Sequence, residues 1–153
     1  MKAHMLTIHE LRSDDEITRA FPLMSALRDR VRPETFLSEV RRQQRDGYEL
    51  FGACDGDVLV ALAGVRRTHT LARGEHLFVD DLVTAESVRG SGHGRVLMGW
   101  LARRAAAEGV GRIYLDSRLT AKGFYERLGF VFLTSIPCSL ELGKALAEPP
   151  AVL

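Results

Sequence analysis

Cysteine is scarce in this 153-residue sequence, and a long apolar run is absent. The two cysteines, Cys54 and Cys138, lie far apart and form no metal-ligand spacing, so we expect no bound metal. The sequence shows no secretory signal pattern, and we therefore expect two reduced cysteines in a cytoplasmic protein. No apolar run approaches the roughly 18 residues of a membrane span, so we expect no membrane association.

An excess of charge of one sign is also absent. The chain has 21 lysines and arginines against 20 aspartates and glutamates, a formal net charge of +1. A general nucleic-acid binder would usually be strongly basic, so we expect no nucleic-acid partner. Hydrophobic residues make up 46% of the chain and charged residues 27%, the balance of an ordinary soluble domain. The length predicts one domain, which we place at residues 1–142, with a C-terminal tail at residues 143–153.

Hydrophobic periodicity predicts the elements in the first third of the chain. Alternation at residues 5–11 predicts a strand, and the acidic residues after Ser13 are typical of a capped helix start. Pro22 lies inside the helical pattern that follows, so we expect that helix to kink or restart there. Pro33 then opens a second helix.

The remaining residues predict a sheet with helices between some of its strands. Two strands over residues 48–67 are joined by a turn at Asp55-Gly56-Asp57, and a third strand covers residues 76–83. The elements expected after these are a helix with apolar positions 96–105, a buried strand at 112–116, a short helix at 121–128, and strands at 130–135 and 138–142. The order is strand, two helices, three strands, helix, strand, helix, two strands. It predicts an α/β fold of the α+β kind, with one mixed sheet.

The segment VRGSGHGR, residues 88–95, stands between a predicted strand and a predicted helix. Its glycines, Gly90, Gly92 and Gly94, would let a phosphate approach the first N–H groups of that helix, where the helix dipole is positive. Arg89 and Arg95 add positive charge. These residues predict a phosphate-bearing cofactor. The competing interpretation is a tight strand-to-helix crossover with solvated arginines.

Two known phosphate loops fit this segment poorly. A Walker loop needs a Gly-Lys-Ser/Thr sequence, which does not occur in the chain. A Rossmann fingerprint needs a third glycine where Arg95 stands, although Asp116 ends a following strand as a ribose-binding acid would. Only about a third of the chain follows the glycines, which is short for a dinucleotide domain.

Residues 89–94, Arg-Gly-Ser-Gly-His-Gly, fit the pattern Arg/Gln-x-x-Gly-x-Gly/Ala, and GFYERLGF follows at residues 123–130. With the element order above, these motifs resemble the GNAT superfamily of acyl-CoA-dependent N-acyltransferases, over roughly residues 5–142. The resemblance implies acetyl-CoA as the cosubstrate. It implies that the backbone of Leu82, Val83 and Thr84 pairs with the pantetheine arm. The pyrophosphate would then be held by the amides of Arg89, Gly90, Ser91, Gly92, His93, Gly94 and Arg95. For His93 the alternative is a solvent-exposed loop histidine.

The resemblance also places a catalytic tyrosine at Tyr125. In many family members a tyrosine at this position protonates the departing CoA thiolate, and a positioned acid contributes roughly 10²–10⁴ in rate. The alternative is a core aromatic residue, because Tyr125 shares an apolar helix face with Phe124 and Leu128. Tyr48 and Tyr114 have strand positions and are interpreted as core or sheet-surface residues.

An amine acceptor must lose a proton, because an alkyl ammonium has a pKa near 10.4. Asp80 and Asp81 lie in the strand beside the expected thioester. Successive strand residues face opposite sides, so we expect at most one of them to face the acceptor. Several family members carry an acidic pair here, and the resemblance assigns the base to Asp80. In the alternative, both carboxylates are solvated or bind a neighbouring loop.

The sequence departs from the family pattern at Arg118, where many relatives have an asparagine that contacts the cofactor arm. Arg118 and Lys122 would either meet the 3′-phosphate of CoA or lie as solvated charges at a helix start. Neither cysteine is placed near the site by the sequence, so we expect no covalent acyl-enzyme.

We therefore expect an N-acetyltransferase that works by direct attack in a ternary complex, and a non-catalytic acyl-CoA sensor of the same fold is the alternative. A small-molecule amine is the expected acceptor, and a homodimer is a further expectation from the family. Arginines at positions 28, 30, 32, 41, 42 and 45 could form a basic rim for an anionic acceptor, or simply exposed helix faces.

Overall fold

A computed structural model describes residues 5–143, in two compact units that divide between Ser117 and Arg118. The first unit contains a five-stranded sheet, made of β1 (Thr7–Glu10), β2 (Tyr48–Asp55), β3 (Val58–Thr70), β4 (Gly74–Thr84) and β5 (Ile113–Leu115). The strands lie in sequence order. The first four are antiparallel to their neighbours, and β5 is parallel to β4. The predicted mixed sheet is therefore confirmed.

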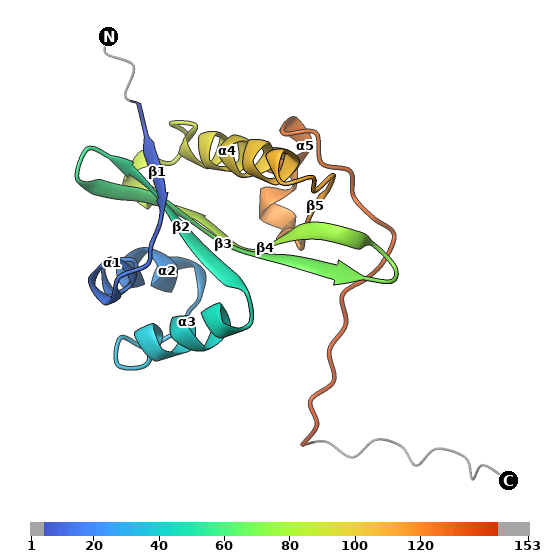
Figure 1. The fold of residues 1–153 in the computed structure, drawn as a ribbon, viewed down its shortest axis with the longest axis horizontal. Coiled ribbons are helices and arrows are strands. Elements are labelled where there is room, and N and C mark those ends of the chain that lie inside the picture. The colour runs from blue at the N-terminus through green and yellow to red at the C-terminus, as the bar shows by residue number, and fades with distance from the viewer. Residues whose placement is uncertain (1–4, 144–153) are drawn as a thin grey trace, which may run out of the picture. The chain divides into compact units, whose positions relative to one another are not determined.

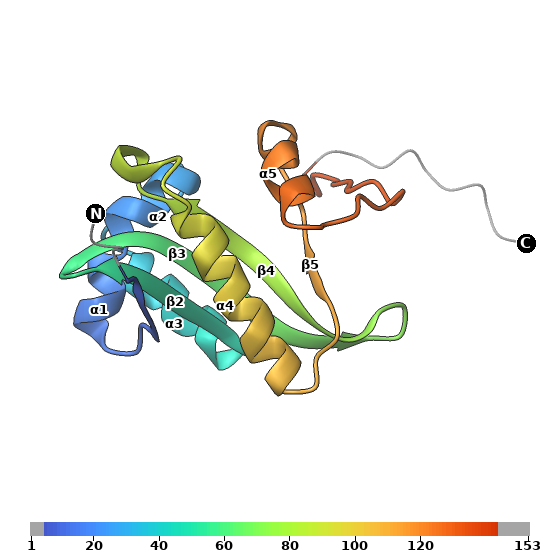
Figure 2. The same ribbon diagram turned by 90° about the horizontal axis from the view of Figure 1, so that it is seen from above.

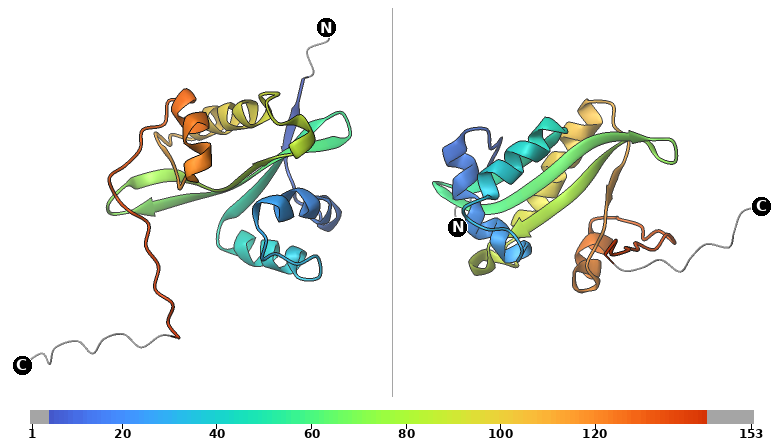
Figure 3. Two further views of the ribbon diagram at one scale, coloured as in Figure 1. Left: turned by 180° about the vertical axis from the view of Figure 1, so that it is seen from behind. Right: turned by 90° about the horizontal axis from the view of Figure 1, so that it is seen from below.

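Helices cover both faces of this sheet, as Figures 1 and 2 show. One face carries α1 (Asp14–Arg19), α2 (Phe21–Leu27) and α3 (Phe36–Arg45), and α4 (His93–Ala107) lies along the other face. The two further views in Figure 3 show the same three-layer arrangement in the first unit. Within residues 5–143, no helix combines the length and the apolar character needed to cross a bilayer.

The N-terminal helices follow the sequence signals closely. The Ser13 side chain accepts a hydrogen bond from the Glu16 N–H at 3.1 Å, and the Glu16 carboxylate accepts one from the Ser13 N–H at 3.0 Å, which is a complete capping box. Helix α1 ends at Arg19, and a new helix begins with Pro22 in its first turn, where its missing N–H is tolerated. Of the two expected outcomes at Pro22, a kink or a restart, the structure shows the restart. It makes three helices where two were predicted.

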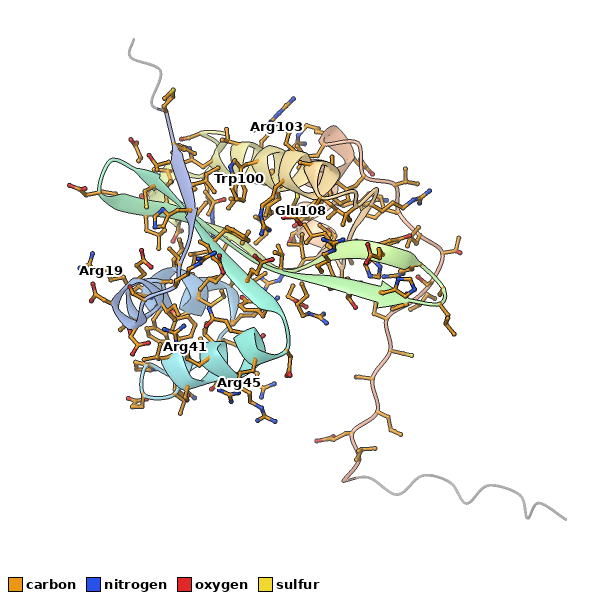
Figure 4. All side chains as sticks on the ribbon, in the orientation of Figure 1. Arg19, Arg41, Arg45, Trp100, Arg103 and Glu108 are labelled. Carbon is orange, nitrogen blue, oxygen red and sulfur yellow. The ribbon has the colours of Figure 1, made fainter. Side chains whose placement is uncertain are left out.

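Two groups of apolar side chains fill the layers of the first unit. On the face of α1–α3, side chains such as Ile17, Leu50 and Leu62 are fully buried, and burying each stabilises the fold by about 1.5–3 kcal/mol. On the other face, Trp100 of α4 packs on Phe51 with ring centroids 5.1 Å apart. Figure 4 shows Trp100 on the side of α4 toward the sheet and Arg103 pointing away from it. Residues of β5 are only half-buried, against the prediction of a buried strand.

The second unit, described from Arg118 to Gly143, contains a short turn (η2, Leu119–Ala121) and helix α5 (Lys122–Arg127). The strands predicted at 130–135 and 138–142 are wrong, because these residues form no strand. A strand needs a hydrogen-bonded neighbour, and the described part of this unit supplies none. Val131 and Ile136 are accordingly more than 80% exposed. The predicted tail at 143–153 lies, after Gly143, outside the described residues.

Candidate functional site

Strand β4 pairs with β5 over only three residues, and we call the segment that follows without a β5 partner, Asp80–Thr84, the open half of β4. The parallel ladder joins Leu77, Phe78 and Val79 to β5 and ends there, while β3 pairs along the other side of β4 as far as Thr84. Among the described residues, the segment Asp80–Thr84 has no strand on its β5 side. Backbone N–H and C=O groups on this edge can therefore bind an extended ligand by the same bonds that join strands.

The glycine segment follows the open half of β4 after a short turn, η1 (Glu86–Val88). The Arg89 N–H donates to the Glu86 carbonyl at 3.3 Å, and the Ser91 N–H donates to the Val88 carbonyl at 3.1 Å. These two amides are thus engaged in holding the loop. The amides that remain for an anion are concentrated at the start of α4.

The N-terminus of α4 presents bare amides. Gly92 is the N-cap residue with φ of +81°, and no side chain caps the helix. The first helical hydrogen bond runs from the Val96 N–H to the Gly92 carbonyl, so the N–H groups of His93, Gly94 and Arg95 have no acceptor within the helix. An added Cβ at Gly90 or Gly92 would meet no atom within 4 Å, which leaves open space in front of the backbone.

The side chains around this helix start suit an anion. Arg89, Ser91 and Arg95 are exposed, and His93 is half-buried. Because α4 is 15 residues long, its dipole adds to the attraction of these bare N–H groups for negative charge. The structure therefore places the predicted phosphate segment before and at the start of one helix, separated from the open strand edge only by the short turn η1.

A β-bulge places the two aspartates of β4 differently from the prediction. Gly64 pairs with Asp81 and Val65 pairs with Val79, so Asp80 is an extra residue without a cross-strand partner. The bulge breaks the alternation that would put Asp80 and Asp81 on opposite faces. Their carboxylates bond to side chains of Arg66 and Tyr48, which are direct cross-strand partners and share one face of the sheet.

Asp81 is the more enclosed of the two carboxylates, with 12% of its side chain exposed. The Tyr48 hydroxyl donates to Asp81 Oδ2 at 2.8 Å, and the Arg28 Nε donates to Asp81 Oδ1 at 2.8 Å. Burial, followed by the Asp81 charge, raises the pKa of Tyr48 well above its ordinary value, so this hydroxyl stays protonated and acts as a donor. A second Arg28 nitrogen, Nη2, donates to the Asp80 carbonyl.

Asp80 is bound by a side chain near the protein surface, and 24% of its own side chain is exposed. Arg66 donates to both of its oxygens, at 2.6 and 2.8 Å, and the Arg66 side chain is itself 42% exposed. The bidentate pair raises the pKa of the Arg66 guanidinium, so Arg66 remains charged.

Tyr125 lies on α5 in the second unit and is 8% exposed. Its ring packs edge-on against Phe124 and Phe130, with centroids 5.0 and 5.4 Å away. Burial raises the pKa of its hydroxyl above 10, so the side chain carries its proton at neutral pH. In the same unit, Lys122 pairs with Glu126 at 3.8 Å and lies over the Phe132 ring.

The two cysteines form no disulfide within residues 5–143. Cys54 is half-buried on β2, Cys138 is exposed, and both are free thiols. No group of three or more metal-ligating side chains gathers anywhere in this range.

Sequence reasoning missed the network around Asp81. Tyr48 was interpreted only as a core or sheet-surface residue, and Arg28 only as part of a basic rim. One signal was present in the sequence: a lone glycine inside a strand, Gly64, indicates a bulge or a close approach of other atoms to the backbone. Here it marks both features: the register of β3 with β4 shifts between Gly64 and Val65, and an added Cβ at Gly64 would lie 1.9 Å from the Tyr48 hydroxyl oxygen.

Sequence comparisons show which known proteins this chain resembles. The acetyltransferase (GNAT) family matches residues 8–130 of the chain. The uncharacterized N-acetyltransferase YhdJ of Bacillus subtilis (strain 168) is 32% identical over 131 residues, which are 82% of this chain and 92% of that protein.

Solved structures share the fold. The aminoglycoside N-acetyltransferase AAC(6')-Iy, in a complex with CoA, matches with a TM-score of 0.78 at 16% identity, over 92% of this chain and 97% of its own. A transcriptional regulator from Bacillus halodurans C-125 matches with a TM-score of 0.75 at 26% identity, over 90% of this chain and 99% of its own.

Proposed function

Because this chain belongs to the acetyltransferase (GNAT) family, we propose that it transfers an acetyl group from acetyl-CoA to an amine by direct attack in a ternary complex. One observation carries the proposal: the open half of β4 leads into a glycine loop that ends at the uncapped N-terminus of α4. Acetyl-CoA carries an extended, amide-containing arm followed by a pyrophosphate. The arm fits the open half of β4 and the pyrophosphate fits the N-terminus of α4, so the order of the two groups in the ligand matches the order of the two features along the chain.

The residues present fit acetyl-CoA. The backbone of Leu82, Val83 and Thr84 would hold the pantetheine arm. The amides of His93, Gly94 and Arg95 would hold the pyrophosphate, with charge from Arg89 and Arg95 and clearance at Gly90 and Gly92. Acetyl-CoA supplies a thioester whose carbonyl carbon is open to attack by an amine.

Two proton movements are then needed from the chain. The amine nitrogen bonds to the acetyl carbon and the carbon–sulfur bond breaks, so the sulfur needs a proton and the nitrogen must lose one. We assign the first proton to the Tyr125 hydroxyl, which burial keeps protonated. We assign the second to Asp80, whose Arg66 partner is exposed enough to move aside.

The test is the release of CoA thiol from acetyl-CoA in the presence of an amine panel. The panel contains a small alkyl amine, amino acids, an aminoglycoside and a peptide with a free N-terminus, because the acceptor is open among these classes. Amine-dependent thiol release with at least one member supports the proposal. Binding of acetyl-CoA with no thiol release across the panel contradicts it.

That second outcome would support the alternative of a non-catalytic acyl-CoA sensor. The likeness to the transcriptional regulator from Bacillus halodurans C-125 favours this alternative, since that protein shares the fold and is described by a regulatory role. The presence of a protonated tyrosine at position 125 favours the enzyme. A cytoplasmic location, a small-molecule acceptor and a homodimer stay predictions.

A further inference from the structure

The adjacent carboxylates of β4 have contacts of different kinds. Asp81 is held from inside the protein by Tyr48, which is 3% exposed. The Tyr48 ring lies directly over the backbone of Gly64, the cross-strand partner of Asp81, and only a glycine leaves room for it. Asp81 therefore has one oxygen fixed by a neutral donor that is itself locked by packing.

The other oxygen of Asp81 anchors a loop. Arg28 is the C-cap residue of α2 and the first residue of the connection to α3. Its Nε donates to Asp81 at 2.8 Å, and its Nη2 donates to the Asp80 carbonyl, so the guanidinium spans the two residues at which the open half of β4 begins. The connection over residues 28–35, which we name the α2–α3 loop, thus starts beside the open strand edge.

The rest of the α2–α3 loop has few other anchors. Val31 packs against the core cluster, whereas Arg30 and Arg32 are exposed. The loop's own backbone bonds are short-range, such as the bond from the Val31 N–H to the Arg28 carbonyl at 3.4 Å. The bonds from the Arg28 side chain to β4 therefore hold the start of the loop against the strand.

We propose that Asp81 is a positioning residue. Tyr48 holds Asp81, and Asp81 in turn fixes Arg28, so that the α2–α3 loop forms one wall of the acceptor-binding site. Asp80 alone then serves as the base. The acceptor-side role rests on the proposed function, because only that function makes the open half of β4 the site of the thioester. The contrast in partners supports the division. Each aspartate pairs with an arginine whose side chain is about two-fifths exposed, but only Asp81 also accepts a hydrogen bond from a buried hydroxyl, that of Tyr48.

Limited proteolysis with trypsin tests the anchor without any substrate. Cleavage after Arg30 requires the α2–α3 loop to detach, and its rate follows the population of the detached state when opening is fast. We expect Tyr48→Phe and Arg28→Gln each to raise this cleavage rate about fivefold or more. Cleavage after Arg103, on the exposed side of α4, reports global unfolding in the same sample.

A matched control is Tyr114→Phe, because the described residues offer no hydrogen bond to the Tyr114 hydroxyl, and its ring packs on His76 instead. This variant should be cleaved like the wild type. If Tyr48→Phe fails to fold, cleavage after Arg103 rises too, and Arg28→Gln, at a side chain that is 41% exposed, decides alone. Wild-type cleavage after Arg30 in the folded variants overturns the anchor.

A kinetic arm tests the consequence for the acceptor. With an amine that is turned over, Asp81→Asn should raise the acceptor KM about tenfold or more, with kcat within about threefold and the Kd of acetyl-CoA unchanged. Arg28→Gln should reproduce this pattern. A loss of kcat of about 100-fold or more in Asp81→Asn, with an unchanged KM, would make Asp81 the base and overturn the division. If the wild type acetylates no amine, the proposed function fails while the proteolysis result still decides the anchor.

Discussion

Gly64 is a residue whose missing side chain decides what its neighbours can do. The ideal Cβ position at residue 64 lies 1.9 Å from the Tyr48 hydroxyl oxygen and 2.4 Å from its ring carbon Cζ. Tyr48 is buried and cannot yield toward solvent. The glycine therefore leaves room for the hydrogen bond between Tyr48 and Asp81. The cost is a weaker strand, because glycine is flexible in the unfolded chain and loses more conformational entropy on folding.

Gly64→Ala should destabilise the protein by about 2–4 kcal/mol, because overpacking adds to the loss of a buried hydrogen bond. The measurement is the urea midpoint of unfolding. Gly111→Ala is the matched control, since a Cβ there meets no atom within 4 Å and its φ is not positive. Stability equal to that of the control would mean that Tyr48 does not occupy the space over Gly64.

Tyr125→Phe removes only the hydroxyl group, whose proton the proposed mechanism uses. We expect kcat to fall at least about tenfold with a nearly unchanged Kd for acetyl-CoA, because the ring and its packing remain. Since burial raises the pKa of Tyr125, its proton stays in place until the pH exceeds about 10, and the wild-type kcat should not fall through this group below that pH. Unaltered turnover in Tyr125→Phe, with Tyr114→Phe as the reference, would remove Tyr125 from the chemistry.

On the scale of single elements, the two ends of α4 offer a paired test. Gly92 before the helix and Gly109 after it have φ of +81° and +80°, and an added Cβ meets no atom within 4 Å at either. Gly92→Val and Gly109→Val should therefore cause similar backbone strain, about 1–3 kcal/mol. Only Gly92→Val should abolish acetyl-CoA binding, measured by calorimetry, because its side chain blocks the bare amides. Normal binding by a folded Gly92→Val protein would refute the assignment of the loop.

The capping box of α1 makes a pH-dependent contribution to stability. Backbone hydrogen bonds from Ser13 and then Arg12 lower the pKa of Glu16 below its ordinary 4.5. A carboxylate with a lowered folded-state pKa stabilises the fold above about pH 4.5, and this contribution is lost as the pH falls through the folded pKa.

Glu16→Gln should accordingly be less stable than the wild type at about pH 6, and the difference should shrink toward about pH 3. Urea unfolding across this range measures it. The control is Glu34→Gln, because Glu34 is exposed and forms no hydrogen bond or ion pair within the described chain. A difference from the wild type that stays constant with pH would mean that Glu16 does not act through its charge.

Elements with local signals were predictable from the sequence, and those that depend on distant partners were not. The capped start of α1, the restart at Pro22 and the turn at Asp55-Gly56-Asp57 each follow from neighbouring residues. The strands expected at 130–135 and 138–142 rested on alternation alone, and alternation cannot supply a pairing partner. The same limit explains the site. The glycine segment was found because it is contiguous, whereas the link from Arg28 through Asp81 to Tyr48 joins three separate elements.

On the scale of the whole molecule, the formal charge of +1 gives no long-range attraction for an anionic ligand such as acetyl-CoA. The attraction must come from the local groups at the start of α4, namely its bare amides with Arg89 and Arg95. Binding should therefore be specific to a ligand that also fills the open edge of β4. Other phosphate-bearing cofactors present a pyrophosphate or triphosphate but lack the pantetheine arm.

Thermal unfolding of the whole chain separates these cases. A ligand present at about 100 times its Kd stabilises a protein by roughly 2.7 kcal/mol, which for a chain of this size raises Tm by about 5–10 °C. We expect this rise with acetyl-CoA and none with NADH or ATP at the same concentration. A rise with NADH alone would favour a dinucleotide site at the glycine segment. If no ligand raises Tm, the glycines only turn the chain from β4 into α4, and the amides at the start of that helix hold no cosubstrate.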